Sequence, residues 1–566
     1  MTASSPHLQP QSPSHPAPTL ADAEKSDLHP LPSQIPHTLP NSTSASASIS
    51  QNLPAGLAYL EQGRAIPLTG ERKVTTKWEY WGYCIFYIGA SGVGPFNFAA
   101  AQFQNLMYQA FPDETIRWAG STKTLDAFIL DINGITFAIQ TLCFLLIGPY
   151  SDYGNWRPYI LIFFTLISWA AGFAWLGIES AEKWKAATAV YMLGYFAFNV
   201  AVGFYFAAFP GLVRDLPKVI QSEREVLEGR KDAEEHAKLD MLERSKLSNL
   251  SLIFSAAGAT LILALGLSIP FSLIPSSPSS PSYTTQNTKT YSILVGYFTA
   301  FWVICAVPWF WKEQYRPGQK VPQGVRWWTV GGRQVWEGCK CAWQLRETML
   351  YLAAFFLLND ALNTSGTVIG ILQNNVIQFD TKKSVGLYMV AFGTEAIGIF
   401  VMNWVQQKWG LSAKLMAIVT GGAIVFFNFW GLLGLWTTKI GYHNAWEFYA
   451  WQAYLGLAVG GWYTYSNTMI SEVVPAPKMY LFFALFQIVG KTSAFVGPFI
   501  ASAIIDDAGG NTSACFWFLV FSGLAGVLLL CLVNPDRAKR DCAKYLEKEA
   551  RDLYREKESA VSEEGV

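Results

Sequence analysis

Three charged residues lie inside long apolar stretches, where they have the potential to do chemistry. Lys491 lies near the middle of MYLFFALFQIVGKTSAFVGPFIASA, residues 479–503. Asp360 lies at similar depth in YLAAFFLLNDALNTSGTVIG, and Glu395 in VGLYMVAFGTEAIGIFVMNWV. About 20 apolar residues form a helix that crosses a bilayer. A charge at its centre costs about 2.5–3.5 kcal/mol, so it needs a counter-ion or a water-filled cavity.

These charges favour a polytopic transporter in which they meet near the membrane midplane. We expect Lys491 to pair with Asp360 or Glu395 when no substrate is bound. The alternative is that this ion pair is only structural and has no contact with a substrate. The two interpretations differ in what removal of both charges would do to transport.

The composition is that of an integral membrane protein. Of the 566 residues, 51% are hydrophobic, 14% are charged and 15% are aromatic. The formal net charge is zero, which gives no global attraction to nucleic acid. Cys339 and Cys341 lack the second pair that a zinc site needs, so we expect no metal or cofactor. The phosphate-binding pattern GxxxxGK[ST] does not occur, and nothing supports an enzyme.

The apolar stretches divide into two sets of six, separated by the polar segment 312–347. Residues 1–75 are rich in Ser and Pro and are predicted to be disordered. The fold class that follows is an all-α polytopic membrane protein, with twelve transmembrane helices in two six-helix halves, 76–311 and 348–535. The predicted spans are 81–106, 124–148, 158–178, 187–210, 248–272, 291–311, 348–372, 384–406, 414–436, 445–470, 478–505 and 514–534.

Lysine and arginine are distributed unequally between the two sets of loops. One set holds 19 of them and the opposite set holds 8, which predicts that the first set and both termini are cytosolic. This places loop 211–247, the central loop 312–347 and the tail 536–566 in the cytosol. Residues 217–247 mix both charge signs and are predicted to form a solvated helix. On the opposite side, Asn511-Thr-Ser is a predicted glycosylation site.

The loop GPYSDYGNWRP, residues 148–158, resembles the signature loop of the major facilitator superfamily. The resemblance implies that Asp152 and Arg157 latch the cytoplasmic side and that Gly148 permits close helix approach. Tyr153 stands where a basic residue is usual in that superfamily. A surface turn without a gating role is the alternative.

Four stretches together resemble the fungal autophagy-related vacuolar amino-acid effluxer family. They are YWGYCIFYIGASGVGPFNFAAAQFQ, AFNVAVGFYFAAFPGLVRDLPKV, FFLLNDALNTSGTVI and FFALFQIVGKTSAFVGPF. The resemblance covers about residues 76–535. It implies a major facilitator fold in the vacuolar membrane and export of neutral amino acids, such as leucine, isoleucine and tyrosine, into the cytosol.

A zwitterionic substrate at the midplane needs an acid or carbonyl for its ammonium and a cation for its carboxylate. Span one also holds the helix breakers Gly92, Gly94 and Pro95. Since no ATP-binding motif is present, we expect transport to be driven by the substrate gradient or by protons, with Asp131, Asp360 and Glu395 as the candidate proton carriers. The candidate substrate-binding residues are Asn97, Gln102, Asn199, Asn359, Asp360, Asn363, Tyr463, Asn467 and Lys491.

Other functions remain open from the residues alone. Asn and Gln side chains inside membranes often only bridge helices, at about 0.6 kcal/mol each. A facilitator for sugars or peptides has the same architecture. A non-transporting membrane receptor or scaffold is the rival from another class, but it has no use for charges in the middle of the membrane. The predicted partners are therefore a small-molecule substrate and the lipid bilayer.

Overall fold

The computed structural model describes residues 72–151, 155–277, 279–316, 330–475 and 479–564, all within one compact unit that spans 53–566. Most of the tail 1–75 and the loop residue Asp152 lie outside the described residues. The described part is helical except for turns and one two-stranded hairpin. This confirms the predicted all-α membrane class.

The first half contains ten helices and a β-hairpin among its described residues. The hairpin pairs β1 (Thr115–Trp118) with β2 (Ser121–Thr124) in antiparallel register, where the sequence predicted only a connecting loop. The helices are α3 (Lys77–Gly89), α4 (Ala99–Ala110), α5 (Leu125–Ile147), α6 (Arg157–Ala174), α7 (Trp184–Phe206), α8 (Phe209–Arg214), α9 (Pro217–Leu227), α10 (Ala233–Gly266), α11 (Ser268–Leu273) and α12 (Tyr283–Lys312).

The second half follows the central segment and ends in a long polar helix. Its helices are α13 (Val330–Gln344), α14 (Arg346–Val376), α15 (Thr381–Trp409), α16 (Ala413–Leu433), α17 (Ala445–Tyr454), α18 (Trp462–Val473), α19 (Met479–Asp507), α20 (Phe516–Leu532) and α21 (Pro535–Glu564). The solvated helix predicted for 217–247 is present as α9 and the start of α10, with a break at Gly229.

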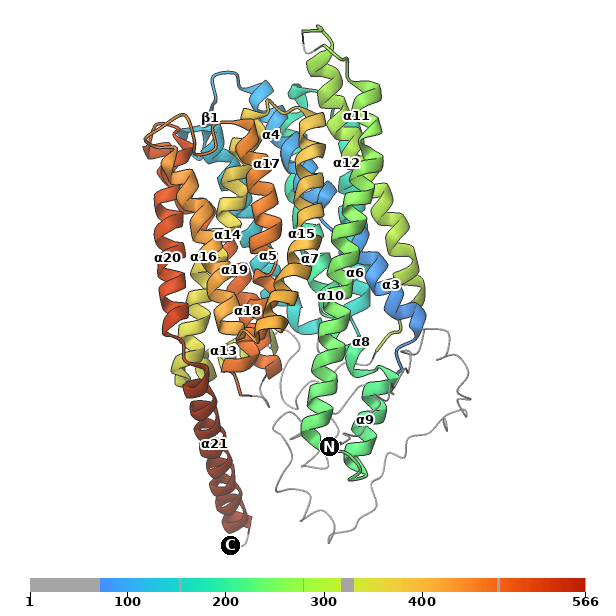
Figure 1. Cartoon of the computed structure of the whole chain (residues 1–566), viewed down its shortest axis with the longest axis vertical. Helices are drawn as coiled ribbons and strands as arrows, with labels where there is room; N and C mark the ends of the chain where they lie inside the picture. The colour runs from blue at the N-terminus through green and yellow to red at the C-terminus, as the bar shows by residue number, and fades with distance from the viewer. Residues whose placement is uncertain (1–71, 152–154, 278, 317–329, 476–478, 565–566) are drawn as a thin grey trace, which may run out of the picture. The chain divides into compact units, whose positions relative to one another are not determined.

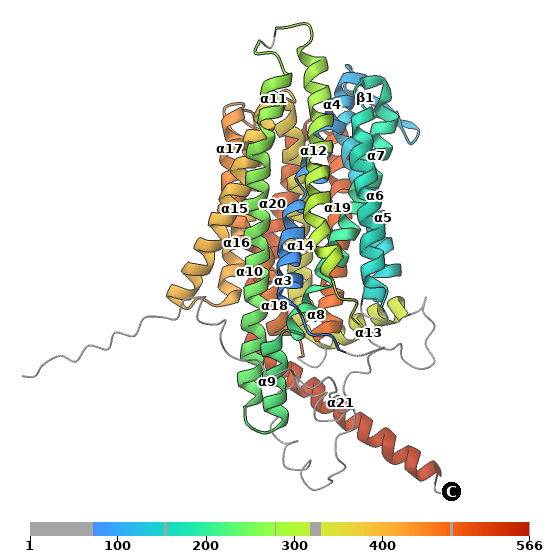
Figure 2. The same ribbon diagram turned by 90° about the vertical axis from the view of Figure 1, so that its right-hand side faces the viewer.

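Two ends of the helix bundle are used as landmarks below. The hairpin β1–β2 and α11 lie at one end, called the hairpin end (Figures 1 and 2). The helices α9, α13 and α21 lie at the opposite end, called the terminal end.

Eleven helices in the described part of the chain are long and apolar enough to cross a membrane. The predicted span 445–470 is the one that does not qualify. It is helical, in the two parts α17 and α18 around a π-turn at Leu455–Val459, and its residues AWEFYAWQAYLGLAVGGW include Glu447, Gln452 and several Trp, Tyr and Gly residues, which lower its hydropathy. The predicted count of twelve is therefore not confirmed.

Helix boundaries follow from local capping groups that the sequence carries. The Thr76 hydroxyl accepts the Glu79 N–H at the start of α3, and Thr124 caps α5 in the same way. The Asp380 carboxylate accepts the N–H of Lys382 at 2.8 Å and so starts α15. Gly410 ends α15 at a φ of 59°, a left-handed conformation that glycine adopts without strain.

The two halves contact each other through corresponding helices. The second span of the first half, α5, packs on α19, which is the fifth span of the second half. Conversely, α10 is the fifth span of the first half and packs on α15, the second span of the second half. A two-fold relation between the halves produces this exchange. Gly134 of α5 makes room for the Phe499 ring of α19, because a Cβ there would lie 2.9 Å from that ring.

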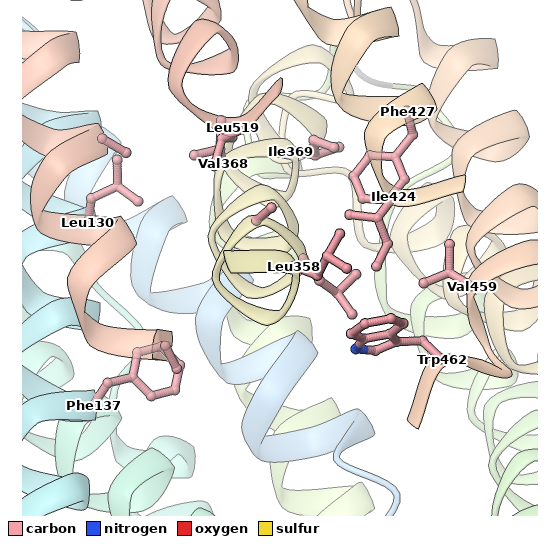
Figure 3. Close-up of a cluster of buried hydrophobic side chains, with 14 of the residues drawn as sticks. Leu130, Phe137, Leu358, Val368, Ile369, Ile424, Phe427, Val459, Trp462 and Leu519 are labelled. Atoms are coloured by element: carbon pink, nitrogen blue, oxygen red, sulfur yellow. The ribbon is translucent and has the colours of Figure 1, made fainter. Parts of the chain in front are cut away.

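The largest hydrophobic core joins helices of both halves. Figure 3 shows part of it, with Leu130 and Phe137 of α5 on one side and Leu358 of α14 near its centre. Leu358 lies beside Ile424 of α16 and Trp462 of α18. These side chains fix the positions of the helices that carry the polar residues described next.

Candidate functional site

Two helices are interrupted by π-turns in the middle of the membrane region. The first π-turn, Val93–Phe98, separates α3 from α4 and starts after Gly92, whose φ is 90°. The second, Leu455–Val459, separates α17 from α18. Irregular backbone within spans is tolerated where it is buried in protein or lines a cavity, and it often marks a functional site. The breaker cluster in span one was predicted, whereas the second π-turn was not.

Lys491 on α19 is only half-buried and has no acidic partner among the described residues. Its ammonium lies 5.7 Å from the centre of the Phe144 ring on α5. Its backbone carbonyl accepts the Thr141 hydroxyl of α5 at 3.2 Å. The expected ion pair with Asp360 or Glu395 is therefore not formed in this conformation. Contact with an aromatic face and partial exposure satisfy the ammonium instead.

Glu395 on α15 is also half-buried, and no described side chain forms a hydrogen bond with its carboxylate. The charge of Glu395 acts on the phenols of Tyr87 in α3 and Tyr463 in α18. Tyr463 is 55% exposed, although it lies just beyond the second π-turn. A Cβ on Gly460, just after the second π-turn, would lie 3.5 Å from the Glu395 side chain, so Glu395 packs against the interruption between α17 and α18.

Unlike Lys491 and Glu395, Asp360 is buried and its carboxylate is hydrogen-bonded. Only 2% of it is exposed, and its carboxylate accepts the Gly497 N–H at 3.0 Å and the Thr364 hydroxyl at 3.4 Å. A Cβ on Gly497 would collide with this carboxylate. Asn359, one residue earlier, donates to the Gly490 carbonyl and to Ser493. Both side chains connect α14 to α19 within the second half.

The remaining candidate substrate-binding residues differ in whether their side chains form hydrogen bonds within the protein. Gln102 is fully buried and donates to the Thr288 carbonyl and to Ser292 on α12, which holds two helices of one half together. Asn199 and Asn363 are half-buried, and each donates to the carbonyl four residues earlier in its own helix. The two other asparagines, Asn97 and Asn467, are half-buried and exposed, respectively.

At the hairpin end, an ion-pair cluster joins the two halves. The Lys123 ammonium of β2 lies 2.8 Å from Asp131 of α5 and 3.6 Å from Asp506 of α19. Thr124 donates its N–H and its hydroxyl to Asp506, at 3.0 and 3.3 Å. Burial lowers the pKa of Lys123, but the hydrogen bond to Asp131 and both carboxylate charges outweigh it and raise that pKa.

Further polar contacts continue this seam between the halves. Asp126 of α5 accepts hydrogen bonds from Thr512 of the second half and from Tyr108, whose hydroxyl in turn accepts Asn375 at 2.9 Å. Further contacts across the seam include Asn374 to Gln104 at 2.7 Å, Thr381 to Asn287 at 2.6 Å, and Tyr291 with Ser384 at 2.6 Å. We call these contacts, together with the Lys123 cluster, the hairpin-end seal.

At the terminal end, the described ion pairs stay within one half. Arg316 contacts Glu79 at 2.5 Å and Asp215 at 3.0 Å, and Arg72 contacts Asp215 at 2.7 Å. Although burial acts in the opposite direction, the guanidinium groups of Arg214 and Arg72 hold the pKa of Asp215 below its ordinary value. The structure is thus closed by polar contacts at the hairpin end and lacks an equivalent ion-pair seal among the described residues at the terminal end.

The signature loop begins with Gly148, the first residue of a 3-10 turn that follows α5. Asp152 lies outside the described residues, so the proposed latch with Arg157 stays a prediction. Arg157 is buried and donates to Glu313, just beyond α12, at 2.5 Å. Burial raises the pKa of Glu313, and the charge of Arg157 partly offsets this.

This burial changes the expected effect of removing Arg157. An exposed ion pair would contribute only about 0–1 kcal/mol to stability. With Glu313 buried, Arg157→Gln is expected to cost about 3–5 kcal/mol of stability. A buried acid with a raised pKa binds its proton more tightly when folded, so the loss should grow as pH rises through that pKa.

Thermal unfolding in detergent at several pH values measures this effect. The double variant Arg157→Gln/Glu313→Gln should recover most of the stability, and Arg224→Gln, which changes an exposed arginine, is the matched control. Full stability of Arg157→Gln at alkaline pH would show that the pair is not important for folding.

Comparison with known proteins identifies the family. Residues 75–543 match the family described as "Vacuole effluxer Atg22 like". The chain belongs to this family. It is 24% identical over 471 residues to autophagy-related protein 22 of Chaetomium globosum, covering 74% of this chain and 71% of that one. It is 28% identical over 322 residues to autophagy-related protein 22-2 of Emericella nidulans, covering 52% of each.

Two solved structures show similarity at low sequence identity. The nucleoside transporter NupG has a TM-score of 0.46 at 10% identity, covering 80% of this chain and 98% of that one. FucP, a major facilitator superfamily transporter in the outward conformation, has a TM-score of 0.45 at 11% identity, covering 80% and 98%. The predicted family is confirmed, and this vacuole effluxer is a multi-pass transporter of the vacuolar membrane rather than an enzyme.

Sequence reasoning missed several residues that organise the vacuole effluxer. Lys123 and Asp506 are 383 positions apart, and no local pattern predicts that they meet. Tyr87 and Phe144 had no signal beyond being aromatic residues in predicted spans. Asn511 is exposed at the hairpin end, where its side chain accepts the Ser513 N–H at 3.1 Å. Its glycosylation stays a prediction.

Proposed function

We propose that this chain exports neutral amino acids from the vacuole lumen to the cytosol by alternating access. The observation that carries the proposal is that two charges within spans, the Lys491 ammonium and the Glu395 carboxylate, are half-buried and have no ionic partner among the described residues. They lie on α19 and α15, two helices that also form the contacts between the halves. Phe144 lies beside the ammonium, and the charge of Glu395 acts on the phenols of Tyr87 and Tyr463.

A neutral amino acid supplies the two charges that complement this arrangement. Its carboxylate binds Lys491, its ammonium binds Glu395, and its side chain packs on the aromatic rings. Asn97, Asn199, Asn363 and Asn467 are the polar groups that complete the site. Gln102, Asn359 and Asp360 hold helices together behind it, so they support its shape without contacting the substrate.

The conformation described above is the one open to the cytosol in this proposal. The lysine and arginine distribution places the terminal end in the cytosol and the hairpin end in the lumen. Loading from the lumen then requires the hairpin-end seal to open. Each hydrogen bond contributes only about 0.5–1.5 kcal/mol net, so the seal can exchange with an open state on binding.

Protons are the coupling ion that the charges suggest. Glu395 is the candidate carrier within the substrate site. Asp131 is the candidate at the hairpin end, where it can exchange its contact with Lys123 for a proton from the lumen. A sugar facilitator has no need for an isolated lysine and glutamate, so we favour the amino acid over the sugar alternative.

Efflux from isolated vacuoles tests the proposal. Vacuoles are loaded with labelled leucine, glucose or a dipeptide, with and without this protein. We expect the protein to accelerate leucine release alone. Acceleration of glucose or dipeptide release without an effect on leucine would replace the substrate class and leave the transporter assignment intact.

A further inference from the structure

The helix α13 exposes an aromatic face, which is unusual for a linker helix surrounded by water. Trp336 and Trp343 are seven residues apart, so they lie on one side of the helix. They are 72% and 79% exposed, and Lys340 is exposed between them. The opposite side, which is buried, carries the small residues Gly338 and Ala342. The bulkiest apolar side chains of the described part of α13 therefore point away from the protein.

The position of α13 places this face at the level where the spans end. It packs against α5 and the turn after it, against α19, and against α14, the helix that follows it. In Figure 2 it lies at the terminal end and runs crosswise to the spans. A helix in this position lies along the membrane surface rather than across it.

Other tryptophans mark the same level independently of α13. Trp156 precedes α6, Trp311 ends α12 and Trp409 ends α15, and all three are exposed. The Lys312 ammonium lies 4.7 Å from the Trp311 ring, so a cation accompanies the aromatic ring there. Tryptophan with nearby lysine is typical of the boundary between lipid acyl chains and headgroups.

We propose that α13 is an interfacial helix whose face of Trp336, Cys339, Lys340 and Trp343 inserts into the phospholipid bilayer at the terminal end. The indole rings lie at the headgroup level, and the Lys340 ammonium reaches the lipid phosphates. Lipid is the occupant that continues the existing contact, because the spans beside α13 are already surrounded by it. The helix α13 contacts α5 of the first half and α19 of the second. Its insertion therefore anchors to the bilayer the segment that connects the two halves.

Depth measurement with a spin label tests this inference on the full chain in phosphatidylcholine–phosphatidylserine nanodiscs. Cys339 and Cys531 are the exposed thiols of the described residues, so Cys531→Ser directs the label to α13. Collision rates with oxygen, which concentrates in lipid, and with a water-soluble nickel chelate give the depth. The lipid reference is a label on Cys531, which lies on the apolar helix α20, in the variant Cys339→Ser. Met241→Cys in the protein without either thiol is the water reference, because Met241 is exposed on the solvated part of α10.

We expect the label at Cys339 to collide with the nickel chelate several-fold less often than the label at position 241, and with oxygen more often. Trp336→Ser/Trp343→Ser should raise the nickel collision rate at Cys339, in protein that elutes as a single species. A label at Cys339 with the nickel accessibility of position 241 would overturn the inference. Protection from both reagents would overturn it too, because protein rather than lipid would then cover the face.

Discussion

Lys491→Met is expected to reduce amino-acid transport by about 30- to 5,000-fold, the equivalent of losing a buried charge contact worth about 2–5 kcal/mol. The reason is that Lys491 supplies the ammonium for the substrate carboxylate. Since no acid pairs with Lys491 among the described residues, the substitution leaves no carboxylate stranded. We therefore expect the variant to fold normally, unlike the variant of a paired lysine. Initial rates of leucine transport and size-exclusion profiles give the two readouts.

The matched control is Lys383→Met, which changes an exposed lysine at the start of α15. It should transport like the unmodified protein. If Lys491→Met also transports normally, Lys491 does not bind substrate and the site lies elsewhere between the halves. If it fails to fold, its role is structural.

Locking the hairpin-end seal is expected to stop transport almost completely. Thr124 and Asp506 belong to opposite halves, and their side-chain oxygens lie 3.3 Å apart. Oxidation of Thr124→Cys/Asp506→Cys should therefore join the halves covalently where they must separate for loading from the lumen. Transport should disappear on oxidation and return with reductant.

The single variants Thr124→Cys and Asp506→Cys, treated with the same oxidant, control for the chemistry itself. Proteolysis between the halves followed by gel electrophoresis reports how much disulfide has formed. Undiminished transport in fully cross-linked protein would mean that the hairpin end does not open during the cycle.

The sequence predicted the elements well because their signals are local. Apolar length placed the eleven helices that qualify as membrane spans. Their exact starts were not predicted, since α3 begins after the cap Thr76 and α15 after the cap Asp380, three or four residues before the expected positions 81 and 384. The interruption of span one was also predicted, from Gly92 and Pro95. The β-hairpin was missed, since TIRWAGSTKT contains few of the features of a strand pair in isolation.

The arrangement of the site could be predicted only in part. Lys491 and Glu395 were identified because charges in apolar stretches are conspicuous, but whether they have partners among the described residues depends on how whole helices pack. Asp360 was assigned a substrate role on its charge alone. In the structure this carboxylate accepts the N–H of Gly497, 137 positions away, a contact that the sequence did not predict. Contacts of this kind depend on tertiary structure, and no periodicity or local motif encodes them.

Counterflow with the purified protein in liposomes tests the central claim most directly, since no other vacuolar protein is present. Liposomes filled with unlabelled leucine are diluted into a trace of labelled leucine, and uptake of label is measured over time. The account predicts a transient accumulation of label that Lys491→Met abolishes. It also predicts that leucinol and isocaproate, which lack the carboxylate and the amine respectively, do not replace internal leucine. Accumulation driven equally by either analogue, or by glucose, would contradict recognition of a zwitterion by Lys491 and Glu395.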